Sequence, residues 1–193
     1  MALFTESPSQ PERQPNLVLI GYRATGKTSV GARLAEALYR PFVDLDQVLV
    51  REAGRSVADI VAQDGWAEFR RLEKALVARY RDARGLILAT GGGVILDPDN
   101  VAALRENGIL IWLVADPAAI QARLAQDQPR DANRPSLTGE DTVREVLEVL
   151  EARSPLYQAA ADMSVDTTHR SVFQVVELVL AALTSKEAGN LGG

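Results

Sequence analysis

The sequence predicts an α/β fold in which helices cover both faces of a five-stranded parallel sheet. Five short apolar runs alternate with longer amphipathic segments over 193 residues. This alternation is typical of βαβ units, whose crossovers make neighbouring strands parallel. The first apolar run leads directly into G-x-x-x-x-G-K-T at residues 21–28, the motif of a phosphate-binding loop between a strand and a helix. The length and a hydrophobic content of 47% indicate one compact domain.

The loop at residues 21–28 predicts a phosphate site. Gly21 and Gly26 let the backbone approach anionic oxygens, and the following helix presents its positive N-terminal end. Lys27 supplies a cation for the outer phosphates, and the Thr28 hydroxyl is a ligand for Mg2+. The alternative is an ordinary turn between a strand and a helix. The motif in its full strand, loop and helix context favours the phosphate site.

The first elements are predicted from apolar runs and from the prolines and glycines between them. Residues 1–15 lack periodicity and carry three prolines, so they are expected to form a flexible arm. A strand follows at residues 17–20, and a helix is expected at 27–39, with Pro41 after it. The next short apolar run, residues 42–46, predicts a strand that ends in two carboxylates.

A helical insertion is predicted between the second and third strands. Residues 47–81 have helical periodicity, and breaks at 54–56 and 64–65 divide them into three helices. The insertion is long for a simple βαβ crossover. The third strand, residues 85–89, is followed by Gly91, Gly92 and Gly93.

The second half of the chain continues the alternation and contains one long irregular segment. Residues 126–140 carry two prolines and no clear periodicity, and loops of this length are usually functional or disordered. The tail at 185–193 is expected to be flexible. The other expected elements are a helix at 98–107, a strand at 109–114, a helix at 117–125, a helix at 141–160 interrupted at Pro155, a strand at 163–166 and a helix at 172–183.

Two carboxylates follow the second strand. If Asp44 and Asp46 both lie on the strand, they project to the same side, while Leu45 points into the packing. Near a phosphate site, one carboxylate would hold the water shell of Mg2+ and the other would accept a hydrogen bond from a hydroxyl. The alternative is that one of them, Asp46 rather than Asp44, caps the following helix.

The triple glycine places a strand end without side chains at the same edge of the sheet. Ligands bind beyond the carboxyl ends of parallel strands, where the phosphate loop and the two carboxylates also lie. The exposed backbone N–H groups of Gly91, Gly92 and Gly93 are therefore expected to bind a phosphate or an anionic or hydroxylated substrate. The alternative is a plain turn.

Several arginines are candidate anion ligands. Arg70 precedes Glu73 by three residues on a predicted helix, so the carboxylate could orient the guanidinium. Arg134 lies in the irregular segment, and Arg153 lies shortly before Pro155. Guanidinium groups suit bidentate capture of carboxylate or phosphate. Taken alone, each arginine is expected to be a surface residue rather than a ligand; only a shared location around the phosphate site would make them ligands. His169, the only histidine, is expected to be solvated.

Composition limits the other function classes. A net charge of −5 argues against nucleic acid and anionic membrane as partners, because both require concentrated basic residues. The chain has no cysteine, which excludes disulfides and thiolate-bound metals and fits a reducing compartment. No apolar run has the length of a membrane span, and the N-terminus lacks the pattern of a signal peptide. These observations predict a soluble cytoplasmic protein.

Seven motifs in order resemble shikimate kinase. They are GYRATGKTSVG, FVDLDQ, EFRRLE, LATGGGVIL, NRPSLTG, EARSPLY and SVDTT, and they cover residues 16–183. The resemblance implies a three-layer P-loop kinase fold with one kinase domain at residues 16–184, a substrate-binding helical insertion at 47–81 and a mobile lid at 126–140. It also implies transfer of the ATP γ-phosphate to the 3-hydroxyl of shikimate, in the biosynthesis of chorismate and the aromatic amino acids. The chain is expected to be a monomer.

The resemblance implies a role for each matching residue on the nucleotide side. The loop residues Ala24, Thr25, Gly26, Lys27, Thr28 and Ser29 would bind ATP. Lys27 would bridge the β- and γ-phosphates, Thr28 would ligate Mg2+, and Asp44 would reach the ion through water. Arg123 matches the residue that packs on adenine, and Arg134 would close with the lid onto the phosphates as a catalytic residue.

On the substrate side, the resemblance implies that Asp46 binds the ring hydroxyls and takes the proton. Arg70 and Arg153 would hold the substrate carboxylate, with Glu73 orienting Arg70. Gly91, Gly92 and Gly93 would contact the substrate and the γ-phosphate through their backbone N–H groups.

One position departs from the family pattern. The family loop commonly has glycine at the position of Ala24, so a positive φ there would strain the alanine by about 1 kcal/mol. A loop that tolerates alanine is the other interpretation.

Two other functions are alternatives to shikimate kinase. A related small-molecule kinase, such as one acting on gluconate, would share the loop without needing the carboxylate, glycine and arginine set. A nucleotide-binding regulatory module would not need Lys27, Thr28, Asp44 and Asp46 together.

Overall fold

The computed structural model describes residues 14–131 and 143–190 and contains a single sheet of five parallel strands in the order β2-β3-β1-β4-β5. Every pairing between neighbouring strands is parallel. The strands are β1 (Asn16–Ile20), β2 (Phe42–Asp44), β3 (Ile87–Ala89), β4 (Gly108–Val114) and β5 (Met163–Asp166). This confirms the predicted fold class.

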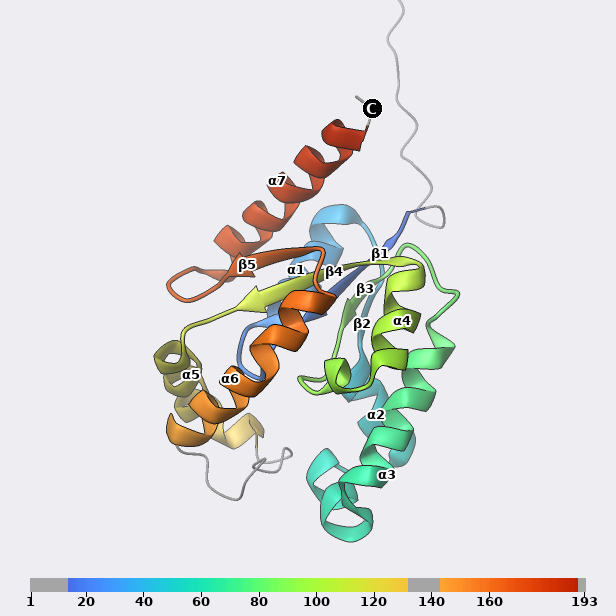
Figure 1. Ribbon diagram of the computed structural model, residues 1–193, viewed down its shortest axis with the longest axis vertical. Helices are drawn as coiled ribbons and strands as arrows, with labels where there is room; N and C mark the ends of the chain where they lie inside the picture. The colour runs from blue at the N-terminus through green and yellow to red at the C-terminus, as the bar shows by residue number, and fades with distance from the viewer. Residues whose placement is uncertain (1–13, 132–142, 191–193) are drawn as a thin grey trace, which may run out of the picture.

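Alternating residues of β1 supply the two apolar cores of the domain. Leu17 and Leu19 pack with the helices on one face, and Val18 and Ile20 pack with those on the other, because successive strand residues point to opposite sides. The first face is covered by α1 (Lys27–Leu38) and α7 (Val172–Asn190). The opposite face is covered by α2 (Leu45–Ala53), α3 (Val57–Arg79), α4 (Pro98–Glu106) and α6 (Val143–Ala160), as Figure 1 shows.

The helical insertion forms as predicted, with a sharp change of direction inside α3. Ser56 caps α3 and forms a capping box with Asp59. Gly65 has φ 82° and ψ 169°, a conformation essentially limited to glycine, and it divides α3 into two helical segments. The insertion thus consists of α2 and the two halves of α3, in agreement with the three expected helices.

Two helices, α5 and α7, are longer than the sequence predicted, and a third, α6, lacks the predicted interruption. Helix α5 (Pro117–Asp131) includes residues 126–131, which were expected to be irregular. Helix α6 continues through Pro155, because buried Val146 and Tyr157 anchor both sides of that proline. Helix α7 runs to Asn190, so most of the expected flexible tail is helical. The remainder of the expected lid, residues 132–140, and residues 1–13 of the expected arm lie outside the described residues.

The parallel topology determines which edge of the sheet carries the candidate active site. The carboxyl ends of β1, β2 and β3 are adjacent at one edge of the sheet, where the phosphate loop, the start of α2 and the triple glycine follow. A 3₁₀ turn, η2 (Val94–Leu96), connects the glycines to α4. Within the described residues, no helix combines the length and apolarity that spanning a membrane requires.

Candidate active site

The phosphate-binding loop connects β1 to α1 and has the strained backbone that its glycines allow. Gly21 has φ 143°, and a Cβ atom there would lie 2.6 Å from the Leu113 carbonyl oxygen, so no other residue fits. The Lys27 side chain is buried, and its Nζ atom donates hydrogen bonds to the carbonyl oxygens of Gly21, at 2.8 Å, and Tyr22, at 2.7 Å. The loop therefore holds the lysine ammonium at its own rim.

Thr28 and Asp44 form a pair that suits Mg2+. The Thr28 hydroxyl donates to Asp44 Oδ2 at 2.7 Å, and Asp44 is buried at the end of β2. A hydroxyl and a carboxylate are oxygen ligands of the kind that Mg2+ prefers, and Mg2+ sites commonly use one or two carboxylates together with water and substrate phosphates. Within the described residues, no group of three or more His, Cys, Asp or Glu side chains is arranged to hold a metal ion.

Asp44 and Asp46 do not share one strand face, and this prediction was wrong. Asp44 is the N-cap of α2, its Oδ1 accepting a hydrogen bond from the Gln47 N–H at 3.2 Å, and Asp46 lies in the first helical turn. The helix turns between the two residues and points them apart. Asp44 faces Thr28, whereas Asp46 faces Gly91, whose Cβ position lies 2.8 Å from Asp46 Oδ1. The cap is thus Asp44, not Asp46.

A cavity of about 540 Å³ next to the loop collects the residues predicted to bind the substrate. It is lined by Asp46, Arg70, Arg153 and all three glycines at 91–93. These residues come from α2, α3, α6 and the segment after β3, so only the fold brings them together. Glu73 also lines the cavity, as the spacing to Arg70 indicated.

Glu73 holds the Arg70 side chain in place. Arg70 Nη1 lies 2.6 Å from Glu73 Oε2, and the residue Glu73 is only 6% exposed. Burial raises the pKa of the Glu73 carboxyl, while the Arg70 guanidinium opposes that shift. The guanidinium carbon of Arg70 also lies 5.1 Å from the ring centre of Phe69 and 5.5 Å from that of Trp66. The carboxylate and the two rings together restrict where this guanidinium points.

The triple glycine makes room for these side chains. A Cβ atom on Gly93 would collide with the Arg70 guanidinium, and one on Gly91 would lie 2.9 Å from Glu73 Oε1. The Gly92 carbonyl oxygen accepts hydrogen bonds from Arg153 Nη1, at 3.2 Å, and from the Tyr157 hydroxyl. The absence of side chains here lets the charged groups of Arg70, Glu73 and Arg153 approach the backbone closely, which is a steric reason for the three glycines.

A second cavity, of about 660 Å³, lies on the other side of the loop and is lined by Ala24, Thr25, Gly26, Ser29 and Arg123. All five were predicted to bind the nucleotide. Arg134, predicted to close over the phosphates, lies outside the described residues.

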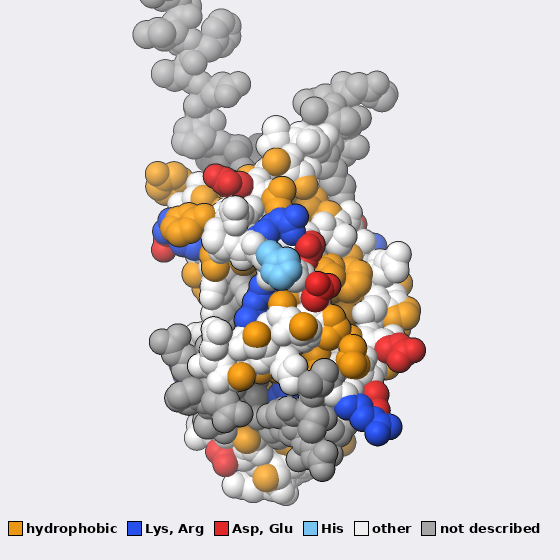
Figure 2. Space-filling model, turned by 90° about the vertical axis from the view of Figure 1, so that its left-hand side faces the viewer, with side chains coloured by type: hydrophobic (Ala, Val, Ile, Leu, Met, Phe, Trp, Pro, Cys, Tyr) orange, Lys and Arg blue, Asp and Glu red, His pale blue; other side chains and the backbone are white. Residues whose placement is uncertain are grey.

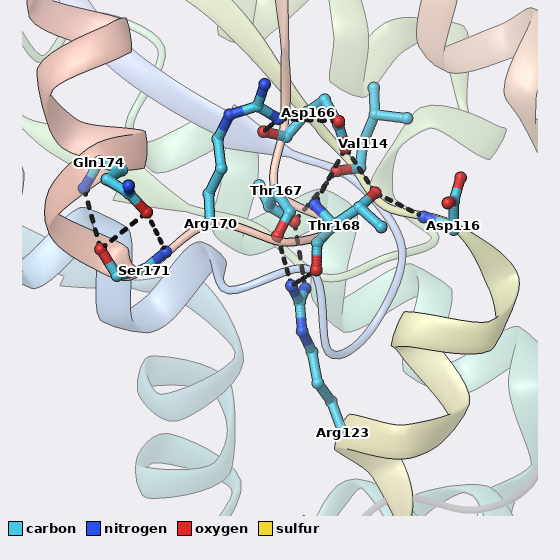
Figure 3. A network of polar contacts seen from close by, with 9 residues as sticks. All are labelled: Val114, Asp116, Arg123, Asp166, Thr167, Thr168, Arg170, Ser171 and Gln174. Carbon is cyan, nitrogen blue, oxygen red and sulfur yellow. Dashed lines mark hydrogen bonds and ion pairs between the residues drawn. The ribbon is translucent and has the colours of Figure 1, made fainter.

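Arg123 links three segments around this second cavity, and Figure 3 shows its contacts to Thr167 and Thr168. From α5 its guanidinium donates to the Ala24 carbonyl oxygen at 3.2 Å, to Thr167 Oγ1 at 3.1 Å and to the Thr168 carbonyl oxygen at 3.1 Å, and it also contacts the Thr167 carbonyl oxygen. The phosphate-binding loop, α5 and the β5–α7 connection are thereby held together.

The β5–α7 connection is also fixed internally (Figure 3). Asp166 Oδ1 accepts hydrogen bonds from the Thr168 hydroxyl, at 2.5 Å, and backbone N–H, at 2.9 Å, and Arg170 Nη1 lies 2.8 Å from Asp166 Oδ2. These hydrogen bonds and the ion pair lower the pKa of Asp166 to about 2. Thr168 Oγ1 in turn accepts from the Asp116 N–H at 3.1 Å, which fastens the connection to the start of α5.

Ala24 adopts the conformation that the sequence analysis identified as strained, with φ 59°. We expect Ala24→Gly to raise the free energy of unfolding by about 1 kcal/mol, since glycine avoids the clash of Cβ in the left-handed region. Urea denaturation measures the change. Ala32→Gly, inside helix α1, is the matched control and should lower stability by about 1 kcal/mol. Equal destabilisation by both substitutions would show that the loop relaxes around alanine.

Several cavity residues were missed from the sequence. Arg23, Trp66 and Phe69 line the cavity with Asp46 and Arg70. The aromatic spacing of three on a predicted helix was an available signal for Trp66 and Phe69. Arg23 lies at a position that the phosphate-loop motif leaves open, so no pattern identified it. His169 is exposed, as predicted (Figure 2).

The chain is similar to known proteins along most of its length. The model of the family "Shikimate kinase" matches residues 23–184. A shikimate kinase of Syntrophus aciditrophicus is 41% identical over 179 residues, which cover 89% of this chain and 92% of that protein. Shikimate kinase 2 of Escherichia fergusonii is 43% identical over 177 residues, which cover 92% and 96% of the two chains.

A solved structure extends this similarity to the fold. The structure of shikimate kinase from Acinetobacter baumannii in complex with shikimate has a TM-score of 0.85 and 30% sequence identity, and the match covers 93% of this chain and 98% of that one. The family match, the identities and the shared fold cover the segments that carry both cavities. The chain therefore belongs to the shikimate kinase family.

Proposed function

We propose that the chain transfers the γ-phosphate of ATP to the 3-hydroxyl of shikimate, giving shikimate 3-phosphate and ADP. The observation that carries this proposal is one cavity, beside the phosphate-binding loop, lined by Asp46, Arg70 and Arg153. Shikimate has one carboxylate, which suits guanidinium groups, and ring hydroxyls, which suit an acidic side chain. The second cavity, on the other side of the loop, would take the nucleotide.

The substrate carboxylate would bind Arg70 and Arg153, which approach the cavity from different helices. Each guanidinium already has a fixing contact, Arg70 to Glu73 Oε2 and Arg153 to the Gly92 carbonyl oxygen. Preorganised groups lose less freedom when a ligand binds, which favours affinity and orientation. The backbone N–H groups of Gly91–Gly93 would complete the contacts to the substrate and the γ-phosphate.

Asp46 would orient the 3-hydroxyl and accept its proton as the oxygen attacks the γ-phosphorus. The bond from the γ-phosphorus to the bridging oxygen then breaks, and ADP leaves with that electron pair. Lys27 would leave the carbonyl oxygens of Gly21 and Tyr22 to bridge the β- and γ-phosphates. Catalysis of this kind depends on positioning and charge neutralisation rather than on a covalent intermediate.

Thr28 and Asp44 would hold Mg2+, directly through the hydroxyl and through water from the carboxylate. The ion supplies neutralisation of the phosphate charge when it is bound. Arg123 would border the adenine from α5, and Arg134 would approach the phosphates when residues 126–140 close over them. Closure of this kind excludes water and limits wasteful hydrolysis of ATP.

We further propose that residues 16–184 form one kinase domain that acts as a monomer in the cytoplasm, with no nucleic acid or membrane partner. The absence of cysteine and the net charge of −5 agree with the compartment and with the lack of polyanionic partners. The reaction belongs to the synthesis of chorismate and the aromatic amino acids. Sedimentation velocity at assay concentration tests the oligomeric state.

The proposal is tested by coupled ADP release with a panel of acceptors. We expect saturable ADP release with shikimate and ATP, dependent on Mg2+, and only background rates with gluconate or nucleoside monophosphates. Phosphorus NMR of the product should show a phosphate on the 3-hydroxyl. Turnover with gluconate in place of shikimate would indicate the related small-molecule kinase, and no turnover with any acceptor would indicate a regulatory nucleotide-binding module.

Arg153→Lys is expected to raise the KM for shikimate about tenfold or more while leaving the KM for ATP within about twofold, because lysine keeps the charge but loses the planar fork. Steady-state kinetics with each substrate varied in turn measures both values. Arg144→Lys, on the same helix and paired with Glu148 on the surface, is the matched control. Equal changes in the two KM values would remove Arg153 from carboxylate binding.

A further inference from the structure

Arg23 is a buried arginine of the phosphate-binding loop that has no part in the roles assigned above. It lies between Gly21 and Ala24 in the segment of the loop that the motif leaves variable, and the residue is only 8% exposed. The residue lines the acceptor cavity together with Asp46, Arg70 and Arg153. A guanidinium is seldom buried without polar surroundings, and in this cavity an anionic ligand would add to them.

The backbone of Arg23 lies at the junction of the two substrates. Lys27 Nζ donates to the Tyr22 carbonyl oxygen at 2.7 Å, and this carbonyl belongs to the peptide bond that leads into Arg23. On the other side, a Cβ atom on Gly92 would lie 3.5 Å from the Arg23 nitrogen. Arg23 therefore lies between the lysine that faces the nucleotide and the glycines that face the acceptor, where a phosphoryl group must pass.

Arg23 approaches the cavity from a different part of the structure than Arg70 and Arg153 do. Arg70 enters the cavity from α3 and Arg153 from α6, whereas Arg23 enters from the loop that cradles the nucleotide. Arg70 is tied to Glu73, and Arg153 to the Gly92 carbonyl oxygen, on the substrate side of the cavity. The two arginines on the substrate side suffice for one carboxylate, so Arg23 is placed for an anion that arrives from the nucleotide.

The charges of the cavity residues agree with separate roles for Arg23 and for the pair Arg70 and Arg153. Three arginines and two acidic residues, Asp46 and Glu73, line the cavity, which leaves at least one positive charge in excess. The single carboxylate of the acceptor matches that excess before the reaction. Phosphoryl transfer then brings further negative charge into the same space, and a planar guanidinium binds phosphoryl oxygens in a bidentate manner.

Resting on the proposed function, we propose that Arg23 contacts the phosphoryl group in transit and then the new phosphate of the product. From its position in the loop, Arg23 neutralises the negative charge of the phosphoryl group on the acceptor side, while Lys27 neutralises that charge on the nucleotide side. An arginine that stabilises a phosphoryl group in this way acts mainly on the transition state. Its loss should therefore lower kcat and weaken binding of the phosphorylated product, with little effect on binding of shikimate.

The test compares Arg23→Met, which keeps an unbranched apolar stem without the guanidinium, with Arg23→Lys, which keeps the charge. We expect kcat to fall about 100-fold or more in Arg23→Met and less in Arg23→Lys, with the KM for shikimate changed less than about threefold. Calorimetry should show the Kd for shikimate 3-phosphate raised at least about tenfold, while the Kd for shikimate stays within about threefold. Arg33→Met, at an exposed site on α1, is the control and should retain wild-type values.

Two outcomes would overturn the inference. A raised KM and Kd for shikimate with unchanged kcat would make Arg23 a ligand of the carboxylate, and wild-type kcat and product affinity in both variants would make it a structural residue. Thermal unfolding of each variant shows whether it folds, and Arg23→Lys provides the test if Arg23→Met does not. Wild-type turnover with shikimate is measured separately, so failure of the proposed function is distinguishable from failure of this inference.

Discussion

Replacing Lys27 with alanine is expected to lower kcat by about three orders of magnitude while the fold remains intact. The side chain is buried at the rim of the phosphate-binding loop, where its ammonium binds the carbonyl oxygens of Gly21 and Tyr22. An amine held this close to the nucleotide cavity needs only a local movement to reach the outer phosphates. Loss of the charge removes the neutralisation of the γ-phosphate in the transition state. Coupled ADP release measures the effect on kcat.

Lys74→Ala is the matched control for this prediction. Lys74 lies on the surface and pairs with Asp97 and Asp99, away from both cavities. We expect it to leave kcat within about twofold, because exposed ion pairs contribute little. Circular dichroism and thermal unfolding show whether each variant is folded. Near-normal turnover by folded Lys27→Ala would contradict the role of the phosphate-binding loop.

The second large effect is expected for Asp46→Asn, which should lower kcat by about 10²- to 10⁴-fold. Asparagine has nearly the same shape and still accepts a hydrogen bond from a hydroxyl, but it does not take a proton at neutral pH. The KM for shikimate should therefore change much less than kcat. Steady-state kinetics at saturating ATP separates the two constants, and single-turnover measurements show that the chemical step is the one affected.

Asp82→Asn serves as the control, because Asp82 is exposed and lies outside both cavities. It should retain wild-type kinetics. A result in which Asp46→Asn raises KM without lowering kcat would assign Asp46 to binding alone. The proton would then have to leave by another route, such as directly to the γ-phosphate oxygen.

The strands and the grouping of the site were predictable, because they depend on local patterns and one topological rule. Short apolar runs bounded by glycine or proline identified four of the five strands, β5 was identified without such a boundary, and the alternation with helices made all of them parallel. Ligands of parallel sheets bind beyond the carboxyl ends of the strands. That rule alone placed the phosphate loop, Asp46 and the triple glycine together, as the structure confirms.

The direction of the two carboxylates was not predictable, because it depends on where one helix begins. The run at residues 42–46 alternates like a strand, but Asp44 caps the backbone N–H of Gln47 and starts α2 at Leu45. One cap thus separates a candidate metal ligand from a candidate proton acceptor. A short strand followed directly by a helix leaves too few residues for periodicity to reveal this change.

Helix lengths and arginine positions were missed for related reasons. Periodicity detects only the part of a helix that packs, so the polar end of α7 after residue 183 was not recognised. Pro155 indicated a break, yet packing on both sides of it keeps α6 continuous. The convergence of Arg23, Arg70 and Arg153 is set by tertiary structure, because three separate elements carry them.

The central claim is that one cavity beside the phosphate-binding loop holds the acceptor with its hydroxyl toward the nucleotide. A crystal structure of the protein with ADP, Mg2+ and shikimate tests it most directly. The claim predicts that the carboxylate lies within hydrogen-bond distance of Arg70 and Arg153, and that the 3-hydroxyl lies within hydrogen-bond distance of Asp46, on the side facing the β-phosphate. Shikimate bound in another place, or in this cavity with its carboxylate toward the phosphates, would contradict the claim.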